Sequence, residues 1–159
     1  MGFAEDLLEQ AYHLANLEAA APKQASLRRA VSTAYYALFH LLIDEAVGNW
    51  SIVRHRSTLA RIFEHSKMKA VCLEHVKDFY RSGQPASELP LMSVAQAFAQ
   101  LQEERHKADY DNSVVWSRDD ALAAVNLAAS AFTHWSGART QDRGQDLLLQ
   151  LFLPKAARL

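Results

Sequence analysis

The chain has 159 residues, a mass of 17.8 kDa and a net charge of −1, which is the size of one domain. Hydrophobic residues make up 50% and charged residues 22% of it, so a disordered or fibrous chain is excluded. Five glycines and four prolines are too few for the many turns of a β-sandwich or β-barrel. The balanced charge gives no overall attraction to nucleic acid, although residues 54–81 carry seven Lys or Arg against three acidic residues.

The rare glycines and prolines separate long stretches with helical periodicity. In chain order these stretches cover about 3–22, 23–48, a region ending at Gly83, a region that follows Pro90, a region ending at Gly137, and 142–154. We therefore predict an all-α fold, a single up-and-down bundle over 1–159 with about five main helices and a short C-terminal helix.

Two local patterns support these helices. Leu27, Val31, Ala34 and Leu38 follow one stripe of the second helix, at steps of four, three and four residues. Ser117 precedes Asp119 and Asp120, which predicts an N-cap with acidic residues in the first turn of the fifth helix.

The sequence also bears on location. No run of 18 apolar residues occurs, so we expect no transmembrane helix and no membrane partner. The N-terminal residues include Glu5, Asp6 and Glu9 and lack the pattern of a secretory signal. We expect a cytoplasmic protein.

The second helix carries a row of polar side chains opposite its apolar stripe. Its members are Arg29, Thr33, Tyr36 and His40, which successive steps of four, three and four residues place on one face. Two interpretations are open: the row joins neighbouring helices through hydrogen bonds, or it forms one wall of a cleft for a ligand or RNA.

The fourth helix contains an arginine where an apolar residue is expected. Val94, Phe98 and Leu101 define its apolar stripe, and Arg105 is the next position along it. An arginine is almost never buried without a partner, so Arg105 must be paired, must line a cavity, or must extend to solvent at the helix end. Asp109 lies one turn later and is a candidate partner.

Other chemical signals are weak. No two histidines are three or four residues apart, and no glycine-rich phosphate loop occurs, so we predict neither a metal nor a cofactor. Cys72 lies on an apolar stripe, which predicts a small buried residue and not a nucleophile. The leucines of 147–149 and 151–153 either pack back on the bundle or form a contact between molecules.

Two segments resemble prokaryotic proteins of the HEPN-domain family. The segment from Leu27 to His40 is similar to their Tyr-Tyr-Ala-x-Phe helix, and the segment from Arg105 to Tyr110 is similar to the Arg-x-x-Ala-Asp-Tyr signature of one branch. The resemblance extends over roughly residues 26–135. It implies a helical bundle that commonly dimerises, often a ribonuclease toxin that needs no metal and is paired with a nucleotidyltransferase antitoxin.

The family's active site is an arginine followed by a histidine after four to six intervening residues. Arg105 matches the arginine, but Tyr110, Asp111 and Asn112 stand where the histidine would be. The expected site is therefore Arg105 on a phosphate in a dimer cleft, Asp109 orienting it, and Tyr110 and His40 nearby. His40 is a candidate for the missing histidine, because the second helix could bring it to Arg105 from across the bundle.

Three hypotheses follow from the sequence. The first is a HEPN-like homodimer of a toxin–antitoxin or defence system that acts on RNA or a nucleotide, as a possible ribonuclease. The second is an inactive HEPN module that binds a partner such as a nucleotidyltransferase. The third is a helical scaffold in which Arg105 and Asp109 only join two helices.

Overall fold

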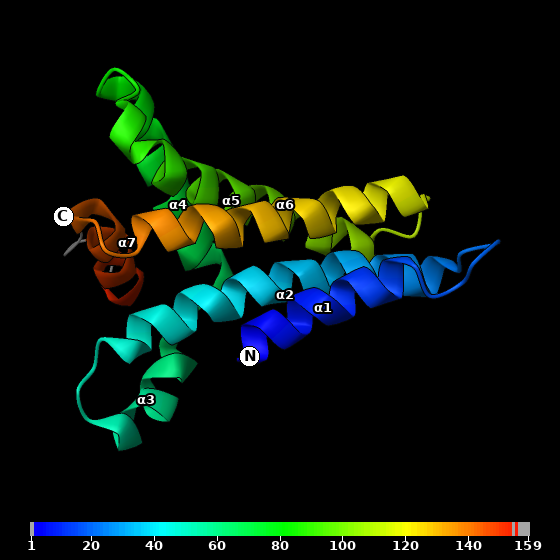
Figure 1. The fold of residues 1–159 in the computed structure, drawn as a ribbon, viewed down its shortest axis with the longest axis horizontal. Coiled ribbons are helices and arrows are strands. Elements are labelled where there is room, and N and C mark those ends of the chain that lie inside the picture. The colour runs from blue at the N-terminus through cyan, green and yellow to red at the C-terminus, as the bar shows by residue number, and fades with distance from the viewer. Residues whose placement is uncertain (1, 154, 156–159) are drawn as a thin grey trace.

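The structure is a computed structural model that describes residues 2–153 and 155. These residues form an all-α bundle, which confirms the predicted fold class (Figure 1). Two single 3₁₀ turns, Ala60–Ile62 and Ala86–Glu88, precede α4 and α5. The helices of the described residues are α1 Phe3–Ala15, α2 Gln24–Gly48, α3 Val53–Leu59, α4 His65–Arg81, α5 Leu89–Tyr110, α6 Arg118–Ala138 and α7 Asp142–Phe152.

The central helix of the bundle is α2. It packs against α1, α5 and α6, while α1 and α5 each also touch α6, so these three helices follow one another around it (Figure 1). The largest fully buried side chains come from different helices and meet in one core, among them Tyr35 of α2, Phe98 of α5 and Trp135 of α6. Burial of this apolar surface is what stabilises the bundle.

The first helix is shorter than predicted. It ends at Ala15 and not near Pro22, because Asn16 caps it with a side-chain bond of 3.0 Å to the Tyr12 carbonyl. The chain beyond is fixed by bonds to distant residues: Ser26 Oγ donates to Glu18 at 2.7 Å, and Arg118 donates to the carbonyl of Glu18. Apolar spacing alone does not reveal bonds of this kind.

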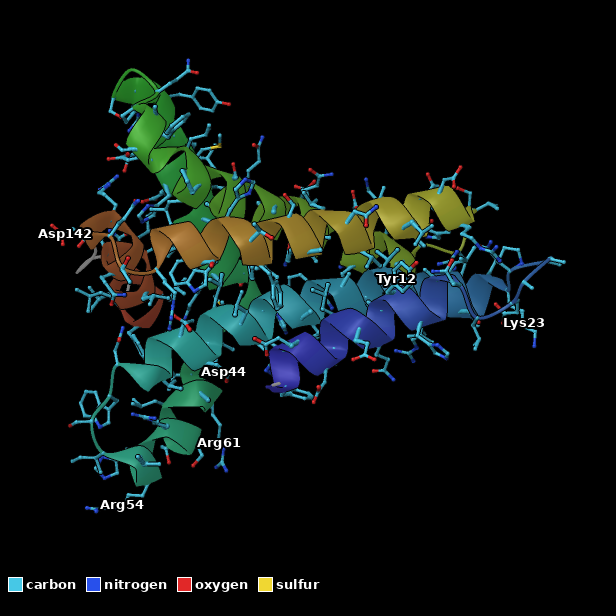
Figure 2. The ribbon with its side chains drawn as sticks, viewed as in Figure 1. Tyr12, Lys23, Asp44, Arg54, Arg61 and Asp142 are labelled. Carbon is cyan, nitrogen blue, oxygen red and sulfur yellow. The ribbon has the colours of Figure 1, made fainter. Side chains whose placement is uncertain are left out.

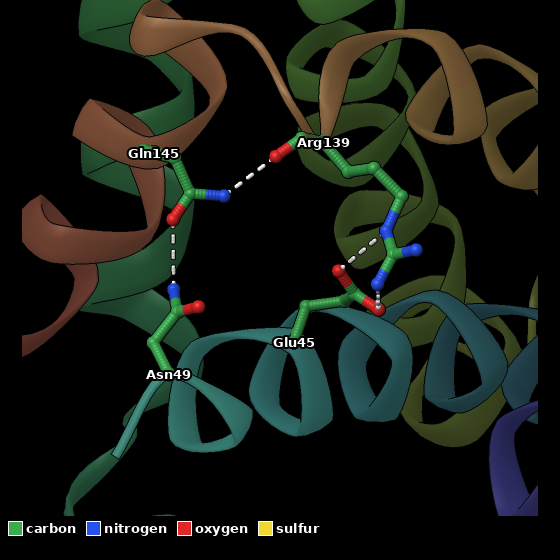
Figure 3. A network of polar contacts seen from close by, with 4 residues as sticks. All are labelled: Glu45, Asn49, Arg139 and Gln145. Carbon is green, nitrogen blue, oxygen red and sulfur yellow. Dashed lines mark hydrogen bonds and ion pairs between the residues drawn. The ribbon is translucent and has the colours of Figure 1, made fainter. Parts of the chain in front are cut away.

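The C-terminal helix α7 closes one end of the bundle against α2 and α4. Figure 3 shows the polar network that holds it there. Arg139 donates to both oxygens of Glu45 at 2.9 and 3.0 Å, and Asn49 donates to Gln145 at 2.8 Å. Gln145 in turn donates to the Arg139 carbonyl.

The predicted leucine patch is therefore divided. Leu147, Leu148 and Leu151 pack on the core, whereas Leu149 is 47% exposed. Most of the patch packs back on the bundle, as the first of the two interpretations expected.

The short helix α3 projects from the bundle below the end of α2 (Figure 1). It was not predicted as a separate helix, and none of its residues is buried. Arg56 attaches the segment by donating to the carbonyls of Trp50 and Gly48 at 2.9 and 3.0 Å. Figure 2 shows Arg54 and Arg61 on this projecting part.

The N-terminus of α6 agrees with the sequence pattern. Ser117 accepts a hydrogen bond from the Asp120 backbone at 3.1 Å, and Asp120 accepts one from the Ser117 backbone at 2.9 Å. This reciprocal pair is a capping box, so the predicted N-cap is confirmed. In the part of the chain that the structure describes, no helix is long and apolar enough to cross a membrane.

Candidate functional site

The polar row of α2 lies on the side of that helix that its neighbours leave partly open. Arg29 is exposed, and Thr33, Tyr36 and His40 are half-buried. One flank of the row meets α1, where Phe3 contacts the His40 ring at 4.8 Å between ring centres. The opposite flank of α2 faces α5 and the first residue of α4. At 1.5 Å per residue, the row is about 16 Å long.

Arg105 lies on the buried stripe of α5, with 9% of its surface exposed. Its guanidinium carbon is 5.3 Å from the centre of the Tyr35 ring and 5.9 Å from that of Tyr36. Nη1 is 3.6 Å from Asp109 Oδ2, which is longer than a direct hydrogen bond. The buried Nε has no hydrogen-bond partner in the described structure. Arg105 is therefore paired and buried and does not extend to solvent.

Asp109 connects α5 to α2. The same oxygen, Oδ2, that faces Arg105 also accepts a hydrogen bond from Ser32 Oγ at 3.3 Å. Both contacts are long, so the carboxylate neutralises the guanidinium without occupying all its donors. The predicted pairing of Arg105 with Asp109 is present, and Ser32 is a partner that the sequence had not indicated.

A histidine does reach this cluster, and it comes from α4. His65, the first residue of that helix, forms a 2.6 Å hydrogen bond between its Nδ1 and the hydroxyl of Tyr35. Its ring lies 4.4 Å from that of Phe39 and 5.9 Å from that of Tyr36. Burial, the Arg105 charge and His40 together lower the pKa of His65 below its ordinary value.

Sequence reasoning missed His65. His55, His65 and His75 are spaced by ten residues, and this spacing places no two of them on one helix face. The position of His65 beside Tyr35 depends on how the helices pack, which the spacing does not show. One clue was available: Tyr35 is fully buried, and a buried tyrosine hydroxyl usually needs a hydrogen-bond partner from elsewhere in the chain.

His40, the histidine that the sequence favoured, lies at the other end of the row. Its ring packs edge-on against Phe3 and Phe39, at 4.8 and 5.3 Å. Burial lowers the pKa of His40, while the nearby Asp44 carboxylate partly opposes this. The aromatic contacts therefore place Phe39 between His40 and His65, and it is His65 that shares Tyr35 and Tyr36 with Arg105.

A surface cleft brings three of the other predicted residues together. Its volume is about 380 Å³, and Arg29, Asp109 and Tyr110 line it between the start of α2 and the end of α5. Tyr110 is 67% exposed, and its ring contacts that of His106 in a tilted arrangement, with 5.1 Å between ring centres. Tyr110 thus borders the open cleft rather than the buried side of Arg105.

Arg28, beside Arg29, has a structural task. It donates to the carbonyls of Ala108 at 2.9 Å, Asp111 at 3.0 Å and Val114 at 2.6 Å. These three acceptors lie at and just beyond the C-terminal end of α5, where carbonyls have no partner within the helix. Arg28 therefore forms a fixed wall of the cleft, whereas Arg29, which also lines it, has no hydrogen-bond or ion-pair partner among the residues that the structure describes.

Cys72 is buried in the core and forms no disulfide. Burial raises the pKa of the Cys72 thiol to about 12, so it stays protonated at neutral pH. In the described ranges no three His, Cys, Asp or Glu side chains are close enough to hold a metal ion. Comparison with protein families, curated proteins and solved structures finds no match to this chain.

Proposed function

We propose that this chain is a HEPN-like dimeric protein of a prokaryotic toxin–antitoxin or defence system, which binds or cleaves RNA or a nucleotide in the cytoplasm through Arg105. The observation that carries the proposal is the state of Arg105. It is a buried cation with one long ion pair and an unsatisfied Nε. An arginine left in this state has donors to spare for a second anion.

A phosphate suits those donors. The guanidinium presents a planar set of N–H groups that matches two phosphate oxygens, and it stays charged at any pH of interest. Tyr36 and Tyr110 offer half-buried and exposed rings on which bases can stack. The row from Arg29 to His40 is about 16 Å long, so it can contact more than one nucleotide of a single strand.

A second copy of the chain would convert the open side of α2 into an enclosed cleft. The Arg29 cleft is a surface cleft on one monomer. A two-fold dimer across this cleft and the polar row would place two copies of Arg105 along one strand. Light scattering coupled to size-exclusion chromatography should give twice the 17.8 kDa of one chain. A mass of one chain at micromolar concentration contradicts the dimer.

The RNA proposal is tested by binding and cleavage with the purified protein in excess chelator. Arg105→Ala should weaken binding about 10- to 100-fold, because one charge-assisted phosphate contact is worth about 1.5–3 kcal/mol. The slope of log affinity against log salt should become shallower by about 0.7, which corresponds to one lost contact with a single strand. Arg29→Ala should have a smaller effect in the same direction.

Lys107→Ala is the matched control, because it removes an exposed cation from the same helix two residues away. It should change neither the affinity nor the salt slope by more than the loss of a distant surface charge. Circular dichroism must show that Arg105→Ala is folded. Equal affinity and salt slope in wild type and Arg105→Ala would contradict the proposed phosphate contact.

The second candidate, an inactive module that binds a protein partner such as a nucleotidyltransferase, is favoured by a different surface. An apolar groove of about 640 Å³ lies between the end of α2, the α3 region and α7. Its rim includes Trp50, Ile62 and Leu149, which are 48%, 49% and 47% exposed. If RNA does not bind and a co-expressed nucleotidyltransferase is retained by wild type but not by Leu149→Asp, this second function holds.

A further inference from the structure

The feature that supports a further step is the arrangement of His65 and Arg105 around the same two tyrosines. The Tyr35 ring lies 5.5 Å from the His65 ring and 5.3 Å from the Arg105 guanidinium carbon. The Tyr36 ring is 5.9 Å from each of them. A cation from α5 and an imidazole from α4 thus lie beside the same two tyrosine rings of α2.

The hydrogen bond to Tyr35 orients His65. Nδ1 is held at 2.6 Å from the tyrosine hydroxyl, and the ring is packed on Phe39, while Nε2 makes no hydrogen bond in the described structure. A histidine fixed through one nitrogen and free at the other is the arrangement that proton transfer requires. Burial raises the pKa of Tyr35, so its hydroxyl stays neutral. In the tautomer that carries its hydrogen on Nδ1, the His65 ring donates to the Tyr35 oxygen and keeps the lone pair of Nε2 free to accept a proton.

The charged and titratable groups around His65 favour the neutral ring. Arg105, Tyr35 and Tyr36 face it from α5 and α2, and His40 lies beyond Phe39. The guanidinium and the burial of the ring both oppose a positive imidazole. A neutral imidazole at pH 7 can accept a proton.

We propose that His65 is the proton-transfer residue of the Arg105 site. The inference rests on the proposed function and assigns RNA that has a free ribose 2′-hydroxyl as the substrate. The 2′-oxygen attacks the adjacent phosphorus, its proton passes to His65 Nε2, and the P–O5′ bond breaks as O5′ takes a proton from water. The products are a 2′,3′-cyclic phosphate end and a 5′-hydroxyl end, and Arg105 stabilises the additional negative charge on the phosphoryl oxygens.

The test separates cleavage from binding. Cleavage is measured on an RNA oligonucleotide, and affinity is measured on the same sequence with 2′-O-methyl groups, which cannot react. His65→Asn should keep the affinity within about twofold and lower the cleavage rate about 10²- to 10⁴-fold, the usual contribution of a general base. His106→Asn, an exposed histidine next to Arg105 in the chain, is the control and should cleave like wild type.

A second variant guards against a simple folding defect. Tyr35→Phe preserves the aromatic packing and removes the hydroxyl that holds Nδ1. The rate of the wild type should fall on the acid side of a midpoint below 6.5, as His65 becomes protonated, and Tyr35→Phe should move that midpoint. A merely structural role of His65 would leave the midpoint in place.

Each remaining outcome overturns a different statement. If Arg105→Ala loses cleavage and His65→Asn retains it, His65 is not the proton-transfer residue, while the proposed function stands. If the wild type binds the 2′-O-methyl RNA but cleaves no RNA, the catalytic role fails and the RNA-binding proposal stands. If the wild type neither binds nor cleaves RNA, both proposals fail.

Discussion

Substitution of two adjacent arginines of α2 should affect different properties of the protein. Arg28 donates three hydrogen bonds to carbonyls at the end of α5, at 2.6–3.0 Å, and it is half-buried. Arg29 is exposed and makes no hydrogen bond or ion pair in the described structure. We therefore expect Arg28→Ala to lower the stability of the fold and Arg29→Ala to lower only the affinity for RNA.

The size of the Arg28 effect follows from its contacts. A hydrogen bond to a charged group contributes about 1.5–3 kcal/mol, but one of the three is exposed and their losses overlap, so about 3 kcal/mol is expected in total. For a domain of this length, 1 kcal/mol corresponds to about 2–4 °C. The melting temperature of Arg28→Ala should therefore fall by about 6–12 °C, and that of Arg29→Ala by less than about 2 °C.

Thermal melts followed by circular dichroism, with urea unfolding as a second measure, would test this difference. Arg28→Lys keeps the charge but has a single donor group, so it should recover less than half of the lost stability. The reasoning is refuted if Arg28→Ala melts within about 2 °C of wild type. It is equally refuted if Arg29→Ala loses as much stability as Arg28→Ala.

Three further predictions concern other parts of the fold. An added Cβ at Gly144 would overlap a carbonyl oxygen at the end of α6, so Gly144→Ala should destabilise the fold by more than about 3 kcal/mol in urea unfolding. An added Cβ at Gly137 meets open space, so Gly137→Ala should stabilise the helix by up to about 1 kcal/mol in the same measurement. Ser117→Ala removes a capping bond and should cost about 1 kcal/mol, visible as a melt lower by about 2–4 °C; an unchanged melt would mean that the cap does not matter. Burial lowers the pKa of His75, so the unfolded chain binds a proton at this residue before the folded chain does, and the free energy of unfolding falls as pH drops below 6.5. His75→Asn should reduce the dependence of stability on pH between pH 7 and 5, which urea unfolding measures. His13→Asn, at an exposed histidine, is the control.

The sequence predicted the helices well where their stability is local or comes from a single apolar stripe. The stripe from Leu27 to Leu38 does face the core, and Ser117 does begin α6. It failed where distant residues decide the backbone. Asn16 ends the first helix, and the segment beyond it does not resume helical structure because Arg118 and Ser26 bind Glu18 there.

The candidate site divides in the same way. The stripe position singled out Arg105 and named Asp109 as its candidate partner, but it left open whether the side chain is paired or extends to solvent; the structure shows it buried and paired. The approach of His65 required the packing of α4 on α5, which brings the first residue of α4 to Tyr35 of α2 and which periodicity within a helix does not contain. The sequence therefore favoured His40, which shares a helix with Tyr36, over a histidine on a different one.

The projecting helix α3 has a consequence for how the molecule opens. Because none of its residues is buried, unfolding α3 exposes little apolar surface and has a small free-energy cost. The backbone amides of α3 should exchange with deuterium through local opening. The amides of α2, a helix with many buried residues, should exchange much later, because they are exposed only when the whole domain unfolds. A protease should accordingly cut first between Gly48 and Ile62, leaving two fragments that the rest of the bundle still holds together.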